Sequence, residues 1–107
     1  MSKEMDALEK AKIYTQCISL WGVHLQTLMV VEELAELIFT ISKYNRGKAT
    51  ASDITEEIAD CRIMMNQLMY LTGITEEQVK NKENEKMERL KGRVEEAREK
   101  RKNRGKD

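Results

Sequence analysis

The sequence contains no proline and few aromatic residues. Its 107 residues include one tryptophan, one phenylalanine and three tyrosines, whereas charged residues make up 36% of the chain. Proline interrupts helices more strongly than any other residue, and the abundant glutamate, lysine, leucine and methionine all favour them. We therefore predict an all-α protein, a four-helix, bundle-forming single domain.

Cysteine, histidine and long apolar runs are also scarce. Cys17 and Cys61 fall on apolar helical faces without metal-ligand spacing, which predicts buried, reduced thiols and no disulfide framework. The single histidine, His24, is expected at a helix start rather than in catalysis. No run approaches the roughly 20 apolar residues that span a bilayer, and the N-terminus has no apolar leader. We expect a soluble, cytoplasmic protein without a membrane partner.

Positive charge is concentrated at the C-terminus. Lys and Arg together number 19, as do Asp and Glu, but from Arg98 onward six basic residues face two acidic ones. Such a tail usually forms a solvated helix end, so we do not expect nucleic-acid binding. The predicted organisation is one domain over residues 1–97 and a basic tail over residues 98–107. Glycine-rich phosphate loops, GxSxG elbows and internal repeats are absent from the sequence.

Turn and capping signals predict four helices. Ser2 and Ser52 are the expected N-caps of the first and third helices, and Thr75 with Gln78 forms a capping-box pattern before the fourth. Glycines end the first and third helices. The expected helices span about residues 3–21, 24–44, 53–72 and 75–100.

The second and third helices each carry an acidic pair beside an apolar stripe. The stripe of the second helix is predicted from Val30, Leu34, Leu37 and Ile41. Glu33 lies roughly 60° from the centre of this stripe, and Glu36 follows one turn later on the same side. The stripe of the third helix is predicted from Ile54, Ile58, Cys61, Met65 and Leu68. Glu57 borders it and Asp60 follows at the i+3 spacing, whereas Glu32 and Glu56 point outward.

Four carboxylates on adjacent helices would repel one another unless a cation neutralised them. Oxygen ligands without cysteine or histidine suit a hard divalent ion, Mg²⁺ or Mn²⁺. Acidic residues at these spacings also occur on ordinary solvated helix faces, especially in so charged a chain. The metal interpretation is favoured because both pairs border an apolar stripe.

Apolar residues cover wide arcs of the second and third helices, more than two short neighbours can bury. We therefore expect a homo-oligomer, a homodimer or homotetramer, that completes a four-helix core. The fourth helix is mostly polar, with a thin coiled-coil-like row through Met87, Leu90, Val94 and Ala97.

The acidic pairs belong to a longer pattern. Glu33-Leu-Ala-Glu36, a spacer of 20 residues and then Glu57-Ile-Ala-Asp60 resemble the E-x-x-E and E-x-x-D signature of the MazG-like superfamily of all-α nucleoside triphosphate pyrophosphohydrolases. The Trp21-to-Gln26 segment that precedes the first pair, and the basic segment over residues 86–93, are also similar to that family. The resemblance covers roughly residues 14–93.

The resemblance implies Mg²⁺-dependent hydrolysis of NTPs or dNTPs at the α–β phosphate bond, which releases a nucleoside monophosphate and pyrophosphate. It implies that the catalytic metal ligands are Glu33, Glu36, Glu57 and Asp60. Trp21 and Gln26 are candidates for binding the base. The candidates for binding phosphate are Lys86, Arg89 and Arg93, which share one helical face.

A second interpretation of the sequence has no catalytic role. The fourth helix and the basic tail could form an interaction module that binds a protein or nucleic-acid partner, with the acidic pairs as incidental solvated charges. The response of the melting temperature to Mg²⁺ distinguishes the two interpretations.

Overall fold

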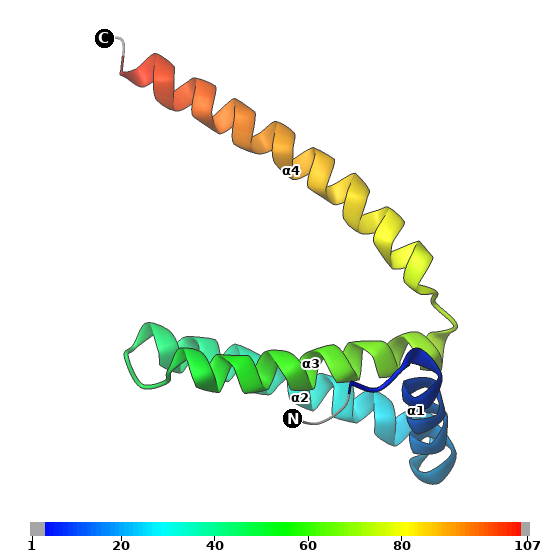
Figure 1. Ribbon diagram of the computed structural model, residues 1–107. Helices are drawn as coiled ribbons and strands as arrows, with labels where there is room; N and C mark the ends of the chain where they lie inside the picture. Colours follow the sequence, from blue (N-terminus) through cyan, green and yellow to red (C-terminus); the bar gives the residue numbers. More distant parts are fainter. Residues whose placement is uncertain (1–3, 106–107) are drawn as a thin grey trace. The chain divides into compact units, whose positions relative to one another are not determined.

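The computed structural model describes residues 4–105, which form four α-helices and no strand (Figure 1). The helices are α1 (Ala7–Trp21), α2 (Val23–Asn45), α3 (Ala51–Thr72) and α4 (Glu76–Arg104). The predicted all-α class is confirmed. The chain divides after Gly73 into two compact units, one containing α1 to α3 and the other containing α4. Within residues 4–105, no helix has both the length and the apolar character needed to cross a membrane.

Side-chain caps fix the starts of α1 and α4. α1 begins after Asp6, whose carboxylate accepts a hydrogen bond from the backbone N–H of Glu9 at 2.8 Å. The prediction that this helix begins at residue 3 is therefore wrong, and its expected cap, Ser2, lies outside the described residues. The predicted capping box before α4 is confirmed, because Thr75 and Gln78 each accept a hydrogen bond from the other's backbone N–H.

The predicted cap of α3 is wrong. Thr50, not Ser52, is the N-cap, and its hydroxyl accepts a hydrogen bond from the Asp53 N–H at 3.2 Å. The Asp53 carboxylate accepts one in return from the Thr50 N–H at 2.8 Å. This reciprocal pair satisfies two backbone donors at once, which a cap at Ser52 would not do, so α3 begins two residues earlier than expected.

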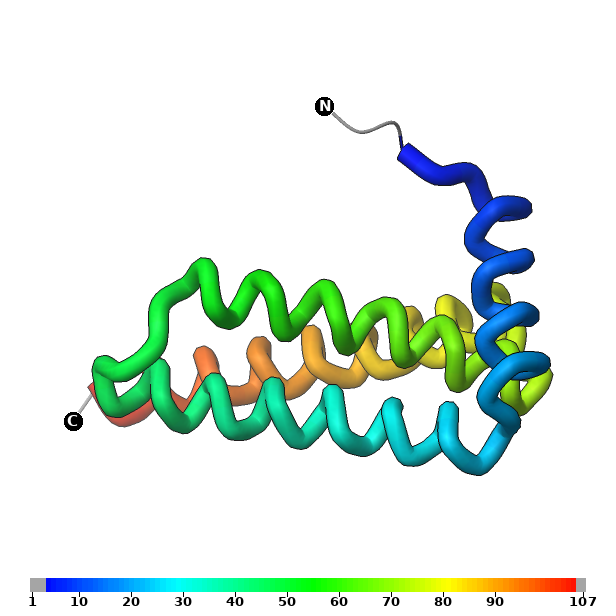
Figure 2. Tube along the Cα trace, turned by 90° about the horizontal axis from the view of Figure 1, so that it is seen from below, coloured from blue at the N-terminus to red at the C-terminus, as the bar shows by residue number. Residues whose placement is uncertain are grey.

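One residue, Gly22, joins α1 to α2. Its φ of 81° lies in a region that glycine enters without strain, and its N–H donates to the Ile18 carbonyl at 2.8 Å. The chain therefore changes direction within one residue, and α1 lies across one end of the hairpin formed by α2 and α3 (Figure 2). At the end of α3, Gly73 adopts the left-handed conformation with φ of 71° and caps the helix.

α2 and α3 run antiparallel and pack through a regular seam (Figure 2). Residues that are buried or half-buried alternate at spacings of four and three on both helices, which is the spacing of a coiled coil. On α2 this row consists of Gln26, Val30, Glu33, Leu37 and Thr40. On α3 it consists of Ile54, Glu57, Cys61, Met64 and Leu68. Two carboxylates therefore occupy seam positions that coiled coils normally fill with apolar side chains.

The predicted apolar stripes are partly wrong. Leu34 and Ile41 on α2 are 38% and 43% exposed, and Ile58 and Met65 on α3 are 42% and 45% exposed. The residue preceding each of these four in the chain lies in the seam or directly beside it. α2 carries an exposed apolar row one residue around the helix from the seam, and hydrophobic periodicity alone does not show that the seam, with polar Gln26, Glu33 and Thr40, is the row that faces α3.

Tyr14 attaches α1 to α3. The Gln67 side-chain amide donates to the Tyr14 carbonyl at 3.2 Å, and the Asn66 amide donates to the Tyr14 hydroxyl at 3.3 Å. The Tyr14 ring also packs on Tyr70, with centroids 5.3 Å apart. These contacts fix α1 near the C-terminal end of α3 and leave the middle of the hairpin uncovered.

The capping box at the start of α3 makes a prediction about stability. Thr50→Ala removes the hydroxyl acceptor and should lower the free energy of unfolding by about 1 kcal/mol. For a chain of this size that corresponds to a fall in Tm of roughly 4–8 °C in a thermal melt followed by circular dichroism. Ser52→Ala is the matched control and should change stability by less than about 0.5 kcal/mol. A larger effect at Ser52 than at Thr50 would contradict the observed helix start.

Candidate metal centre

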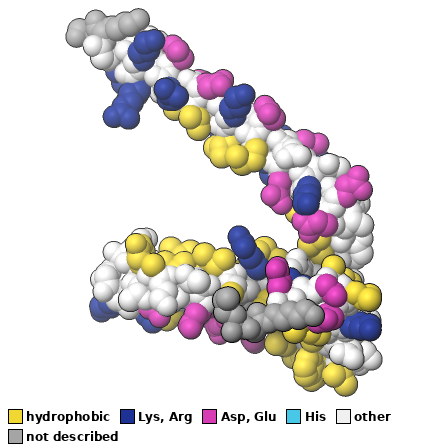
Figure 3. All heavy atoms as spheres, viewed as in Figure 1, with side chains coloured by type: hydrophobic (Ala, Val, Ile, Leu, Met, Phe, Trp, Pro, Cys, Tyr) yellow, Lys and Arg dark blue, Asp and Glu magenta, His cyan; other side chains and the backbone are white. Residues whose placement is uncertain are grey.

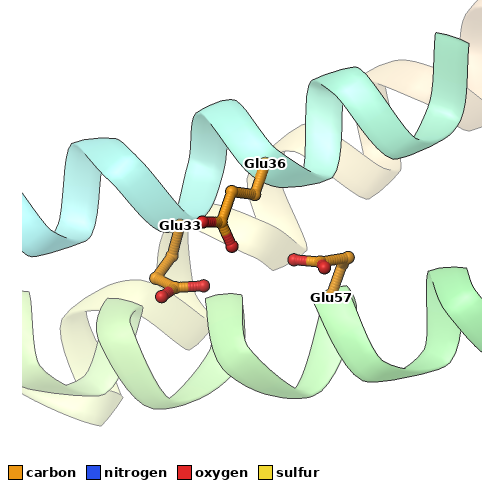
Figure 4. A group of neighbouring side chains, drawn as sticks. All are labelled: Glu33, Glu36 and Glu57. Carbon is orange, nitrogen blue, oxygen red and sulfur yellow. The ribbon is translucent and has the colours of Figure 1, made fainter.

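Three carboxylates converge between α2 and α3. One oxygen from each of Glu33, Glu36 and Glu57 lies within 4.8 Å of the others. Figure 4 shows Glu33 and Glu36 reaching from α2 and Glu57 reaching from α3 into the space between the helices. Glu33 and Glu57 are half-buried, and Glu36 is exposed. We call this group the acidic cluster.

Two oxygens of the acidic cluster are buried without a hydrogen-bond donor. They are Oε2 of Glu33 and Oε2 of Glu57. Within residues 4–105, no lysine or arginine forms an ion pair with either carboxylate, since both ion pairs of the described chain lie on α4. Buried carboxylate oxygens are costly when nothing neutralises them. A cation placed between Glu33 and Glu57 would offset this cost.

Burial and mutual repulsion shift the protonation of the cluster. Burial raises the pKa of Glu33 above its ordinary value of 4.5, and the nearby carboxylates of Glu36, Asp60 and Glu57 raise it further. Burial also raises the pKa of Glu57, with additional repulsion from Glu36, Asp60 and Glu56. Both shifts are what closely spaced carboxylates show in the absence of a counter-ion.

Asp60 lies at the edge of the acidic cluster. Its side chain is exposed and outside the group of three, although its charge acts on both Glu33 and Glu57. Glu32 is exposed and also outside the cluster. The structure thus brings together three of the four predicted ligands and leaves Asp60 beside them.

The thiol of Cys61 fixes the register of the two helices at the cluster. It donates a hydrogen bond to the backbone carbonyl of Glu33 at 3.3 Å, and the residue is 2% exposed. Burial and the four surrounding carboxylates raise the pKa of Cys61 above its ordinary value of 9.0. The side chain therefore stays a neutral thiol, a donor that holds α3 against α2.

The donor set of the cluster fits a hard divalent ion. All its ligand atoms are carboxylate oxygens, which Mg²⁺ and Mn²⁺ prefer. Glu33, Glu36 and Glu57 would hold the ion, with Asp60 available beside them.

The two predicted base-binding residues differ in accessibility. Trp21 ends α1 and is 55% exposed. Gln26 is 1% exposed, and its amide nitrogen donates to the Met29 sulfur at 3.5 Å. Gln26 belongs to the same seam row as Glu33, two turns away or about 10 Å along the helix. It lies in the core in this conformation, and its role in base binding stays a prediction.

The predicted phosphate-binding cations lie on α4. Lys86, Arg89 and Arg93 line one shallow hollow together with Leu90. None of the three belongs to the ion pairs of the described residues, which join Lys82 to Glu85 and Lys100 to Glu96. Their positive charge is therefore available to an anion, although α4 belongs to a different unit from the acidic cluster.

Sequence reasoning missed the buried polar residues of α2 and α3. It assigned the core to apolar side chains, whereas Gln26 and Gln67 are each 1% exposed and Thr40 is 9% exposed. A signal was present, because Gln26, Glu33 and Thr40 recur at intervals of seven residues. A seven-residue recurrence marks one side of a packed helix even when its members are polar.

Comparisons of the chain with protein-family models, with curated proteins and with solved structures find no match.

The raised pKa values predict how stability without metal depends on pH. As pH rises above 4.5, the unfolded chain releases protons that the folded state still holds on Glu33 and Glu57. The free energy of unfolding should therefore fall as pH rises from 4.5 through the raised pKa values. The measurement is a series of thermal melts with EDTA at different pH. Glu57→Gln should reduce the loss of stability with rising pH and raise Tm at neutral pH. Glu32→Gln should show the same dependence of stability on pH as the wild type.

Added Mg²⁺ should reverse the difference in Tm between the wild-type protein and Glu57→Gln. An ion that binds only the folded state stabilises it by about 2.7 kcal/mol at a concentration of 100 times Kd. Wild-type protein should gain stability in Mg²⁺, whereas Glu57→Gln should gain little. Equal gains for the two proteins would show that the cluster is not where the ion binds.

Proposed function

We propose that this protein is a Mg²⁺-dependent nucleoside triphosphate pyrophosphohydrolase that acts on NTPs or dNTPs. The observation that carries the proposal is the pair of buried, unpartnered carboxylate oxygens on Glu33 and Glu57 within the acidic cluster. Packing between helices does not favour two buried carboxylate oxygens without donors. A bound ligand that neutralises their charge is the simplest physical reason for the presence of this pair. Together with the acidic signature described above, it supports metal-assisted phosphate chemistry.

The carboxylates have distinct parts in this proposal. Glu33 and Glu57, anchored on opposite helices, would hold the ion between them, and the exposed Glu36 would complete the set. A divalent ion held there would neutralise the triphosphate and make its α-phosphorus easier to attack. Asp60, exposed at the edge of the cluster, accepts the proton from the attacking water. The bond between the α-phosphorus and the bridging oxygen then breaks, and pyrophosphate leaves.

The triphosphate needs donors beyond the acidic cluster. Lys86, Arg89 and Arg93 provide a row of cations without carboxylate partners among the described residues, and we assign them to the outer phosphate oxygens. Trp21, whose indole is half exposed, is the candidate for stacking on the base. The proposed active form is a homo-oligomer, a dimer or a tetramer.

A second candidate function rests on α4. Met87, Leu90 and Val94 are 61%, 49% and 48% exposed, and they form one apolar row on a helix that makes up its own unit. Such a row is typical of a helix that binds a partner. If the protein is only an interaction module, the acidic cluster has no metal to bind and Mg²⁺ leaves its melting temperature unchanged.

The proposed activity is tested by the products and by one ligand substitution. With Mg²⁺ and each of the common NTPs and dNTPs, the purified protein should release pyrophosphate rather than orthophosphate. Glu36→Gln should abolish this release and leave the circular dichroism spectrum unchanged, because an exposed carboxylate contributes little to folding. Glu32→Gln, an equal change of charge one turn away, should retain activity. A wild-type protein inert on every nucleotide would refute the proposal.

The assignment of the α4 cations makes a separate kinetic prediction. Arg89→Ala should lower kcat/KM by about tenfold or more, which is about 1.4 kcal/mol of transition-state binding. Its Tm without Mg²⁺ should stay within the range of an ordinary surface substitution. Lys100→Ala removes the same charge from an ion-paired position and is the control. Unchanged kinetics in Arg89→Ala would contradict this assignment, and the next cations to test would be Lys43, Arg46 and Lys48, which lie at and just beyond the C-terminal end of α2.

A further inference from the structure

The apolar row of α4 has the spacing of a coiled-coil seam. Met87, Leu90 and Val94 continue with Ala97, at intervals of three, four and three residues. None of the residues of α4 is buried, and Met87 is 61% exposed. The row is therefore a packing surface that about three turns of helix present to solvent.

Cations border this row on both sides. In a coiled coil, the residue before each position a and the residue after each position d flank the apolar seam. Met87 and Val94 take position a, and Leu90 takes position d. The flanking residues are then all cations: Lys86, Lys91, Arg93, Arg98 and Lys100. Within residues 4–105, only the last of these five forms an ion pair, with Glu96, so four flanking charges remain for a partner.

Carboxylates occupy the opposite face of the same segment. At 100° per residue, every glutamate between residues 85 and 99 lies roughly 120° or more from the centre of the row. These residues are Glu85, Glu88, Glu95, Glu96 and Glu99. Figure 3 shows apolar side chains along one edge of the C-terminal half of α4 and acidic side chains along the other. Charges that only keep a helix soluble need no such separation, so the arrangement indicates that the cations face a partner.

We infer that α4 docks an acidic helix of a different protein, one with an apolar row of its own and carboxylates on both flanks of that row. The cations beside the α4 row would repel a second copy of α4 in either orientation. The same cations attract a helix with acidic flanks, whether it runs parallel or antiparallel. This docking rests on the second candidate function and names its partner, and it requires neither metal nor nucleotide.

Other anionic partners fit α4 less well. A nucleic acid would pair its phosphates with the cations, but it would leave the apolar row exposed. Helices that lie on a membrane surface insert a broad apolar face, whereas α4 offers one narrow row. A helix with an apolar row covers Met87, Leu90 and Val94 and pairs with both columns of cations at once.

Two flanking cations separate this docking from the proposed phosphate binding. Lys86 and Arg93 belong to both sets, whereas Lys91 and Arg98 flank the row without belonging to the phosphate-binding set. Arg89 belongs only to the phosphate-binding set, because it lies roughly 120° from the centre of the row. Substitutions at Lys91 and Arg98 therefore test the docking without changing a residue assigned to phosphate.

A designed peptide tests the docking on the full chain in EDTA. The probe is a labelled helix of about three heptads, with leucine at a and d and glutamate at e and g. Fluorescence anisotropy should show binding of this peptide at micromolar concentrations and no binding of the same peptide with lysine at e and g. The double variant Lys91→Glu/Arg98→Glu should bind the glutamate peptide about 30-fold more weakly. Leu90→Gln, which keeps every charge, should weaken binding by about tenfold.

A charge-matched variant is the control. Lys82→Glu/Lys102→Glu changes the net charge equally at positions behind the row and should bind the glutamate peptide as the wild type does. Circular dichroism confirms that each variant keeps its helical content. Failure of the wild type to bind, or equal loss of binding in the two double variants, would overturn the proposal. Wild-type affinity in Leu90→Gln, or tighter binding to an oligonucleotide or to anionic phospholipid vesicles, would also overturn it. The tests with Mg²⁺ and nucleotides are independent of this result, since EDTA removes the metal.

Discussion

The structure depends on two carboxylates placed inside a helical seam. Glu33 and Glu57 occupy positions between α2 and α3 where a coiled coil normally holds leucine or valine, and each keeps one buried oxygen without a donor. Without a cation, the seam combines apolar packing, which favours the folded state, with charge repulsion, which opposes it. A cation bound between them would relieve the repulsion and hold the two helices together, so binding of an ion would be coupled to folding.

The remainder of the hairpin compensates for this repulsion. Val30 is 3% exposed in the seam, and the Cys61 thiol bonds the backbone of one helix from the other. Tyr14 attaches α1 at the far end through two amide side chains. Side chains carried on helices held in this way keep their spacing better than side chains carried on loops.

One hairpin therefore carries three different surfaces: the seam between its helices, an acidic side and an exposed apolar row. They occur on α2 at successive positions, as with Glu36, Leu37 and Ile38, because a helix turns by about 100° per residue. α4 adds a row of cations in a separate unit. Many aliphatic side chains of this short and highly charged chain stay exposed, and they include rows on both α2 and α4.

The sequence by itself determined the helical class, the ends of the helices at Gly22 and Gly73, and the presence of two acidic pairs, because these depend on local propensity and spacing. Only the tertiary structure decided which of two adjacent rows on α2 faces α3, since rows one residue apart have nearly the same hydrophobic periodicity. It also decided that Glu57 joins the cluster while Asp60 stays at its edge, because the separation of groups on different helices depends on their register and distance. The register and the distance between two helices follow from the packing between them, such as the hydrogen bond from Cys61 across the seam. They cannot be obtained from residue spacing along one helix.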